Sequence, residues 1–311
     1  MSEYHRPILL EAVIEGLALK DGGVYLDCTL GGGGHSYGIL NANPTVRLIA
    51  TDKDGDAIGE AGRRLAPFAG RFSLHRTDYK NFESVLKEEG IEELDGFLID
   101  LGISSHQIDD PSRGFAYRIG DAPLDMRMDT RGALTAETVV NTYPEESLRR
   151  IFREYGEESF AAPIARRIVA AREQKPITTT GELKALVEGG IPAKLRSAAC
   201  ARKVFQAIRI EVNGELDGLE ECVRGLLNRL KPEGRACILT FHSLEDRIVK
   251  QVFRDLSVGC TCPKSFPVCV CGKKQEIEII TKKPLTASEE ETKENPRSKS
   301  AKLRIARRLQ E

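Results

Sequence analysis

The chain has 311 residues, of which 41% are hydrophobic and 30% charged, and its formal net charge is −1. This composition suits a globular protein of one large domain or two and excludes a disordered low-complexity chain. The charge balance argues against a protein that coats nucleic acid indiscriminately. Because no apolar stretch is long enough to span a membrane and the N-terminus lacks the order of a signal peptide, we expect a cytosolic protein with no membrane partner.

The first hundred residues alternate between strand and helix patterns. Strands are predicted at 24–29, 47–52, 72–76 and 96–100, with helices at 56–65 and 81–89 between them. Such alternation predicts a parallel sheet with right-handed crossovers. Three of the four strands end at or near an acidic residue, at the carboxyl edge where open α/β sheets bind ligands. We therefore expect an α/β fold of the Rossmann-like type.

This pattern is interrupted after about residue 105. Helices are predicted at 147–172 and 180–188, and a stripe of apolar residues from Phe205 to Leu226 predicts one long helix. A strand at 235–240, a helix at 244–253 and a strand at 302–305 then resume the alternation. The domain prediction is an α/β domain made of 1–105 and 204–311, interrupted by a helical insertion at 106–203.

A glycine run follows the first predicted strand, from Gly31 to Gly34, and Asp27 precedes it. Glycines allow sharp turns and a close approach of a ligand to the backbone. Asp52 ends the next strand, where a carboxylate accepts both hydroxyls of a ribose. The dinucleotide motif G-x-G-x-x-G has Ser36 in place of its last glycine, which favours a ligand with no pyrophosphate and a positive centre. S-adenosylmethionine fits this description, whereas a glycine turn that merely joins strand and helix is the structural alternative.

Several ordered motifs resemble the RsmH (MraW) methyltransferase family, and the match runs from His5 to Ser298. They are the N-terminal HRPILL, the glycine run through Ser36, DKD at 52–54, DLGISS at 100–105, LDMRMD at 124–129, FQAIRI at 205–210 and FHSLEDR at 241–247. The resemblance implies a Rossmann-like methyltransferase that uses S-adenosylmethionine. Its implied substrate is the exocyclic N4 amine of a decoding-centre cytosine in 16S rRNA, within the small ribosomal subunit.

The resemblance also implies which residues bind the cofactor. Carried over by position, they are Gly33, Gly34, His35, Asp52, Tyr79, Asp100 and Gln107. Tyr79 follows the third strand, where its ring would stack on adenine. Asp100 ends the fourth strand and is our candidate catalytic residue, because an acceptor near the cytosine amine would orient its lone pair toward the methyl group.

The acceptor cytosine must be unstacked or already single-stranded to be reached, and the insertion is the predicted substrate-recognition domain. Phe115 is a candidate for stacking on the base, with core packing as its alternative. Two basic runs are candidates for RNA docking. The first comprises Lys194, Arg196, Arg202, Lys203 and Arg209, and the second, in the basic C-terminal tail, comprises Arg297, Lys299, Lys302, Arg304, Arg307 and Arg308.

Four cysteines cluster in a loop at 260–271, at Cys260, Cys262, Cys269 and Cys271. Four thiolates on one loop can enclose a tetrahedral zinc ion. The C-x-C spacing is tighter than the usual two-residue knuckle, so a reduced loop whose thiols bind no metal is the alternative.

Two other function classes remain as alternatives to a methyltransferase. A nicotinamide-dependent dehydrogenase would need the third glycine and a catalytic His/Lys constellation, and a non-enzymatic RNA-binding ribosome-assembly factor would not need Asp52 and Asp100. Ser243 and Asp246 are predicted to form a capping box at the following helix. We assign no catalytic role to His242, because no partner for it is evident in the sequence.

Overall fold

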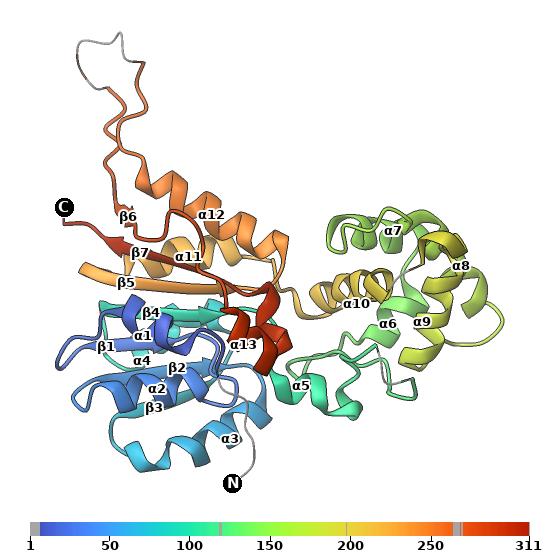
Figure 1. The fold of residues 1–311 in the computed structure, drawn as a ribbon, viewed down its shortest axis with the longest axis horizontal. Coiled ribbons are helices and arrows are strands. Elements are labelled where there is room, and N and C mark those ends of the chain that lie inside the picture. Colours follow the sequence, from blue (N-terminus) through green and yellow to red (C-terminus); the bar gives the residue numbers. More distant parts are fainter. Residues whose placement is uncertain (1–6, 118–119, 197, 264–267, 269, 311) are drawn as a thin grey trace. The chain divides into compact units, whose positions relative to one another are not determined.

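The computed structural model describes residues 7–117, 120–196, 198–263, 268 and 270–310. The chain divides into two compact units, one formed by 1–102 together with 216–311 and the other by 103–215. Figure 1 shows the fold of both units as a ribbon coloured along the sequence.

The first unit is built on a seven-stranded sheet with the order β3-β2-β1-β4-β5-β7-β6. Its strands are β1 (Val24–Asp27), β2 (Arg47–Asp52), β3 (Phe72–Arg76), β4 (Leu94–Asp100), β5 (Leu230–Thr240), β6 (Ile277–Ile279) and β7 (Lys302–Arg308). The neighbours from β3 to β5 pair in parallel, and β7 pairs antiparallel with both β5 and β6. The predicted α/β, Rossmann-like class with a mostly parallel sheet is thereby confirmed.

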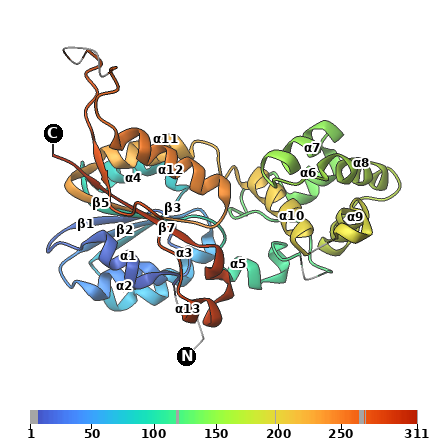
Figure 2. The ribbon, with the colours of Figure 1, turned by 45° about the horizontal axis from the view of Figure 1, so that its top comes forward.

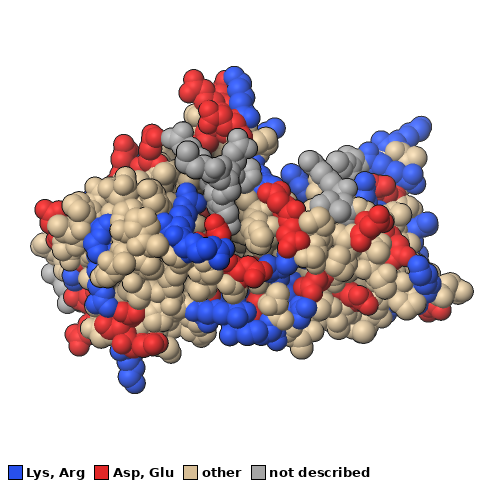
Figure 3. Space-filling view, turned by 90° about the horizontal axis from the view of Figure 1, so that it is seen from below, with Lys and Arg blue, Asp and Glu red and all other residues tan. Residues whose placement is uncertain are grey.

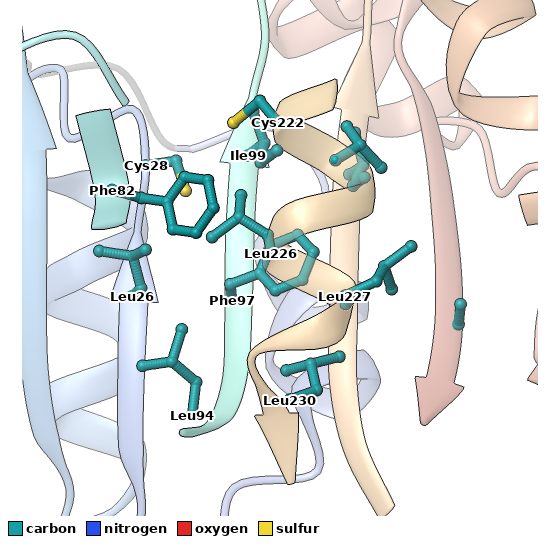
Figure 4. Packing of buried hydrophobic residues seen from close by; sticks show 14 of the residues in the cluster. Leu26, Cys28, Phe82, Leu94, Phe97, Ile99, Cys222, Leu226, Leu227 and Leu230 are labelled. Atoms are coloured by element: carbon teal, nitrogen blue, oxygen red, sulfur yellow. The ribbon is translucent and has the colours of Figure 1, made fainter. Parts of the chain in front are cut away.

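Helices cover both faces of this sheet. They are α1 (Leu10–Leu17), α2 (Gly34–Ala42), α3 (Gly55–Leu65), α4 (Phe82–Glu88), α11 (Leu219–Asn228) and α12 (Ser243–Ser257), and a further short helix, α13 (Glu289–Glu294), precedes β7. Because successive strand residues point to opposite faces, Phe97 and Ile99 pack with α4, α11 and α12, whereas Leu98 packs with α1, α2 and α3. Figure 4 shows Phe82, Phe97 and Leu226 meeting in the first of these two layers.

The second unit is helical. It contains α5 (Ser105–Asp109), α6 (Ala136–Thr142), α7 (Glu145–Glu154), α8 (Ala161–Arg172), α9 (Thr180–Gly189) and α10 (Ala198–Asn213). Its separate core joins apolar residues of α6 to α10 with Phe115 and Leu124 from the preceding loops. The predicted insertion is 106–203, and this unit extends further at its C-terminal end because α10 runs on to Asn213.

Two helix predictions were wrong, both because a glycine-containing segment ends one helix before the next begins. The predicted helix at 147–172 is two helices, α7 and α8, separated by a segment that contains Gly156. The predicted long helix from Phe205 to Leu226 is likewise divided into α10 and α11. Gly214 and Gly218 have φ values of +56° and +66°, a left-handed conformation that ends one helix and precedes the next.

Candidate active site

The carboxyl edge of the sheet carries three acids on three neighbouring strands. Asp27, Asp52 and Asp100 are the last residues of β1, β2 and β4, and β1 lies between the other two. The carboxyl ends of parallel strands meet at one edge. The site therefore gathers three carboxyl groups, whose ionised forms suit a cationic ligand.

Asp52 is tied to the glycine loop. The Gly31 N–H donates to Asp52 Oδ2 at 2.8 Å, and the Asp54 N–H donates to Oδ1 at 2.8 Å. Burial raises the pKa of Asp52, although these two hydrogen bonds oppose the shift. Each carboxylate oxygen keeps a further lone pair. Gly31 has φ +50° and open space where a Cβ would stand, so a ligand has access to the backbone beside this carboxylate.

The start of α2 fixes the next group of predicted site residues. Gly33 is the N-cap residue at φ +73°. A Cβ on Gly34 would lie 2.5 Å from Pro7 Cγ, so this position has no room for a larger residue. His35 is buried, and its Nε2 lies 2.9 Å from the Ile8 carbonyl oxygen. Because a carbonyl only accepts, Nε2 carries the proton.

His35 and Asp100 face each other across this edge. Burial lowers the pKa of His35 and favours the neutral ring. With its proton on Nε2, the ring presents Nδ1 as an acceptor, and Nδ1 lies 3.5 Å from Asp100 Oδ2. Two acceptors at this distance are compatible when Asp100 carries a proton.

The surroundings of Asp100 favour the same protonation state. Burial, together with the charges of Asp27 and Glu245, raises the pKa of Asp100 to about 8. Its side chain is 27% exposed, but its Oδ1 is buried, and no described residue donates a hydrogen bond to it. The Asp100 N–H donates to Thr29 Oγ1 at 2.6 Å. The strand end is thus fixed while one buried carboxyl oxygen is left for a ligand.

The structure adds Asp27, Thr29 and Glu245 to the residues selected from the sequence. Asp27 is buried and accepts from Ser36 Oγ at 2.6 Å and from the Thr29 N–H at 3.1 Å. Burial raises its pKa. The acid before the glycine run was the available signal for Asp27, but a sequence does not show that its carboxylate turns inward to hold the first turn of α2.

Glu245 belongs to the capping box at the N-terminus of α12. The capping box predicted from the sequence was wrong. The N-cap residue is His242 rather than Ser243, and the acid three residues later is Glu245 rather than Asp246. The Phe241 and His242 N–H groups donate to Glu245 Oε2, and His242 Nε2 lies 3.0 Å from Glu245 Oε1. The helix begins one residue earlier than predicted, so His242 and Glu245 together close its N-terminus, and the charge of Glu245 acts on Asp100.

Tyr79 and Gln107 lie outside the strand ends and the glycine loop that carry the other predicted cofactor residues. Tyr79 opens the turn after β3 and is half-buried against the hydrophobic layer, with Lys80 Nζ 5.9 Å from its ring centroid. Burial raises its pKa, so the ring stays neutral. Gln107 belongs to the second unit, where it completes the capping box of α5 with Ser104. The structure thus brings Gly33, Gly34, His35, Asp52 and Asp100 to one edge.

In the second unit, two residues that were candidates for RNA contact have structural roles instead. Phe115 is a buried core residue, which supports the packing alternative over base stacking. Arg209 pairs with Glu215 through two hydrogen bonds of 2.8 Å, and both side chains are largely buried. Arg209 is therefore committed to an internal ion pair rather than to a phosphate.

The basic C-terminal tail is also not an unopposed charge patch. Residues 302–308 form β7 inside the sheet, and Arg304 pairs with Asp246. Arg307 pairs with Glu233 and Glu278, and Arg308 pairs with Glu276. These acids are distant in sequence, so the run alone does not reveal them. On the face seen in Figure 3, basic and acidic side chains are likewise interspersed.

Three of the four clustered cysteines are described. The Sγ atoms of Cys260, Cys262 and Cys271 all lie within 4.8 Å of one another. Cys269 lies outside the described residues, as do His5 and Arg6 of the N-terminal motif. The described cysteines thus converge as a metal site requires.

The fold and this edge together define a Rossmann-like α/β protein with an acidic, glycine-lined ligand site. The chain belongs to the MraW methylase family, whose model matches residues 2–309. A relative named "Ribosomal RNA small subunit methyltransferase H 2", from Agathobacter rectalis, is 52% identical over 97% of this chain and 97% of its own length. The one named "Ribosomal RNA small subunit methyltransferase H" from Carboxydothermus hydrogenoformans is 53% identical over 98% of each chain.

A solved structure of an rRNA methylase from Streptococcus thermophilus aligns with a TM-score of 0.43 and 11% identity, over 98% of this chain and 99% of that one. The family resemblance inferred from the motifs is confirmed by the family match. Within the described part of the chain, the helices are all too short or too polar to cross a membrane.

Proposed function

We propose that this protein transfers a methyl group from S-adenosylmethionine to the exocyclic N4 amine of a decoding-centre cytosine in 16S rRNA. Family membership and the names of relatives about half identical in sequence support rRNA methylation in the small subunit. The observation that carries the assignment of the reacting centre is the buried, unpartnered Oδ1 of Asp100 at the acidic strand edge.

The residues at this edge fit the proposed cofactor. S-adenosylmethionine supplies a methyl group on a positively charged sulfur. Asp52 has lone pairs for the ribose hydroxyls and is held by the Gly31 N–H, and Gly33 and Gly34 form the start of α2 in the same glycine loop. The acids at the strand ends complement the positive charge. Tyr79 is proposed to stack on the adenine, and Gln107 is proposed to contact the cofactor.

Asp100 is the proposed catalytic residue. The lone pair of a cytosine amine is delocalised into the ring, so the amine is a poor nucleophile. A carboxylate that accepts a hydrogen bond from the amine localises this pair and aims it at the methyl group. The free Oδ1 is the atom available for that bond, while Thr29 fixes the backbone and His35 faces Oδ2.

The second unit is the proposed recognition domain for RNA. Lys194, Arg196 and Arg202 are exposed there, whereas Arg209 is held by Glu215. Phosphate contacts of this kind position an RNA without reading its sequence. We expect Lys194→Ala and Arg202→Ala to weaken subunit binding and to reduce its salt dependence, with cofactor affinity unchanged.

The protonation state of Asp100 predicts a pH-dependent cofactor affinity. With a pKa of about 8, Asp100 is mostly protonated at pH 7 in the free protein, and a cationic ligand favours the ionised form. Binding below pH 8 therefore releases a proton, and affinity should rise as the pH rises, by about tenfold between pH 7 and pH 9. Calorimetry in buffers of different ionisation enthalpy measures the proton release.

Asp100→Asn is the control for this pH effect, since its amide does not titrate. A wild-type protein and an Asp100→Asn variant with the same pH profile would contradict the assignment of the titrating group. His35, Asp27 and Glu245 are the other titratable groups around it, so His35→Gln serves as a second comparison.

Two measurements separate the proposed function from its alternatives. Calorimetric titration with S-adenosylmethionine and with NAD tests the dehydrogenase alternative, for which NAD alone should bind. Transfer of labelled methyl groups to small subunits from cells lacking the protein tests the assembly-factor alternative, for which no label should enter the RNA.

A further inference from the structure

The described residues between α12 and β6 include no buried hydrophobic side chain. In both ribbon views this segment extends away from the sheet of its unit (Figures 1 and 2). Its described residues form no helix or strand, and Val268 and Val270 are 70% and 73% exposed. Loops of this length without secondary structure are uncommon unless they are functional or disordered. A chain segment without a core needs a different source of order, such as a disulfide or a metal ion.

The cysteine geometry excludes the first of these for the described residues. Cys260 Sγ and Cys271 Sγ are 3.8 Å apart, whereas a disulfide bond is about 2.05 Å long. Zinc–thiolate bonds of about 2.3 Å at tetrahedral angles place neighbouring sulfurs about 3.8 Å apart. The observed separation matches that of two ligands on one ion, and it is also within reach of a hydrogen bond from the Cys271 thiol to Cys260 Sγ. An iron–sulfur cluster divides its cysteines among two or more irons, so three of them would not all lie this close together.

The third described thiol adds two features that fit a metal ligand. Cys262 Sγ lies within 4.8 Å of the other two sulfurs. It also accepts a hydrogen bond from the Val270 N–H, at 3.4 Å, and such bonds stabilise the negative charge of a ligating thiolate. This bond links the two arms of the segment, one with Cys260 and Cys262 and the other with Cys271.

We propose that Cys260, Cys262 and Cys271 bind a structural zinc ion that joins the two arms of this segment. The sequence offers Cys269, outside the described residues, as the fourth thiolate. Each thiol loses its proton on binding, and no change of oxidation state is involved. Four thiolates would leave no open position for a substrate, as in structural zinc sites. The site is independent of the strand edge that the proposed function uses.

Metal analysis of the full-length protein tests the proposal directly. We expect about one zinc per chain, lost in Cys260→Ser and Cys271→Ser. The control Cys200→Ser changes a cysteine of α10, in the second unit, and should leave the zinc content unchanged. Cobalt added to the metal-free protein should give the visible absorption bands of a tetrahedral thiolate complex, and the Cys260→Ser variant should not.

A structural role also predicts a change in proteolysis. Lys273 and Lys274 are exposed beside Cys271, and trypsin should cleave there at least tenfold faster after zinc is removed by a chelator, while cofactor affinity stays the same. Protein without zinc, protein with iron instead, or zinc retained by both serine variants would overturn the proposal. Because cofactor affinity is measured separately, failure here leaves the proposed function standing, and the reverse also holds.

Discussion

Replacing Asp100 with asparagine should lower the rate of methyl transfer by about 10²-fold or more in a single turnover at saturating cofactor. The substitution keeps the shape of the side chain but removes the carboxylate that would accept a hydrogen bond from the amine. Cofactor affinity at pH 7 should fall much less, because Asp100 is mostly protonated in the free protein at that pH. Asp52 and the glycine loop also remain in place.

Asp56→Asn is a matched control for this loss of charge. Asp56 is exposed in the first turn of α3 and lies off the strand edge, so its variant should transfer methyl groups at the wild-type rate. If Asp100→Asn also did so, the carboxylate would serve the cofactor only, and another group would have to orient the amine.

Replacing Asp52 with alanine should weaken cofactor binding by roughly 5- to 150-fold, or about 1–3 kcal/mol, because the ribose hydroxyls lose their acceptor. The same change removes the acceptors of the Gly31 and Asp54 N–H groups. Calorimetry at fixed pH measures the affinity, and thermal unfolding reports any loosening of the glycine loop.

Asp54→Ala separates the two contributions of Asp52. The Asp54 side chain caps α3 by accepting from the Asp56 N–H at 3.0 Å, so its loss should lower stability by about 1 kcal/mol with little change in affinity. An Asp52→Ala protein that is folded and binds the cofactor as tightly as the wild type would show that Asp52 does not hold the ribose.

The strand pattern was predictable because buried parallel strands are short apolar runs with clear ends. The strands at 47–52 and 72–76 have the predicted bounds, and Asp52 and Asp100 end their strands as expected. The three-residue strand β6 was missed, since so short a segment leaves no detectable period. The division between α10 and α11 depends on the left-handed Gly214 and Gly218, and a continuous apolar stripe conceals it.

The rest of the site depends on contacts between distant residues. Nothing in the sequence shows that His35 faces Asp100, or that Glu245 turns back onto the N-terminus of α12. Charge runs were misleading for the same reason. Arg209 and Arg304 belong to basic stretches, but each is held by an acid, Glu215 and Asp246 respectively, that only the fold brings near.

The most direct test of the central claim is a mass-spectrometric map of modified cytosines in 16S rRNA. Three samples are compared: RNA from wild-type cells, RNA from cells lacking the protein, and RNA from the small subunits of cells lacking the protein after these subunits are incubated with purified protein and S-adenosylmethionine. The account predicts that one N4-methylated cytosine of the decoding centre disappears without the protein and returns on incubation, but not with Asp100→Asn. An unchanged map, or a methyl group restored on another atom or another base, would contradict it.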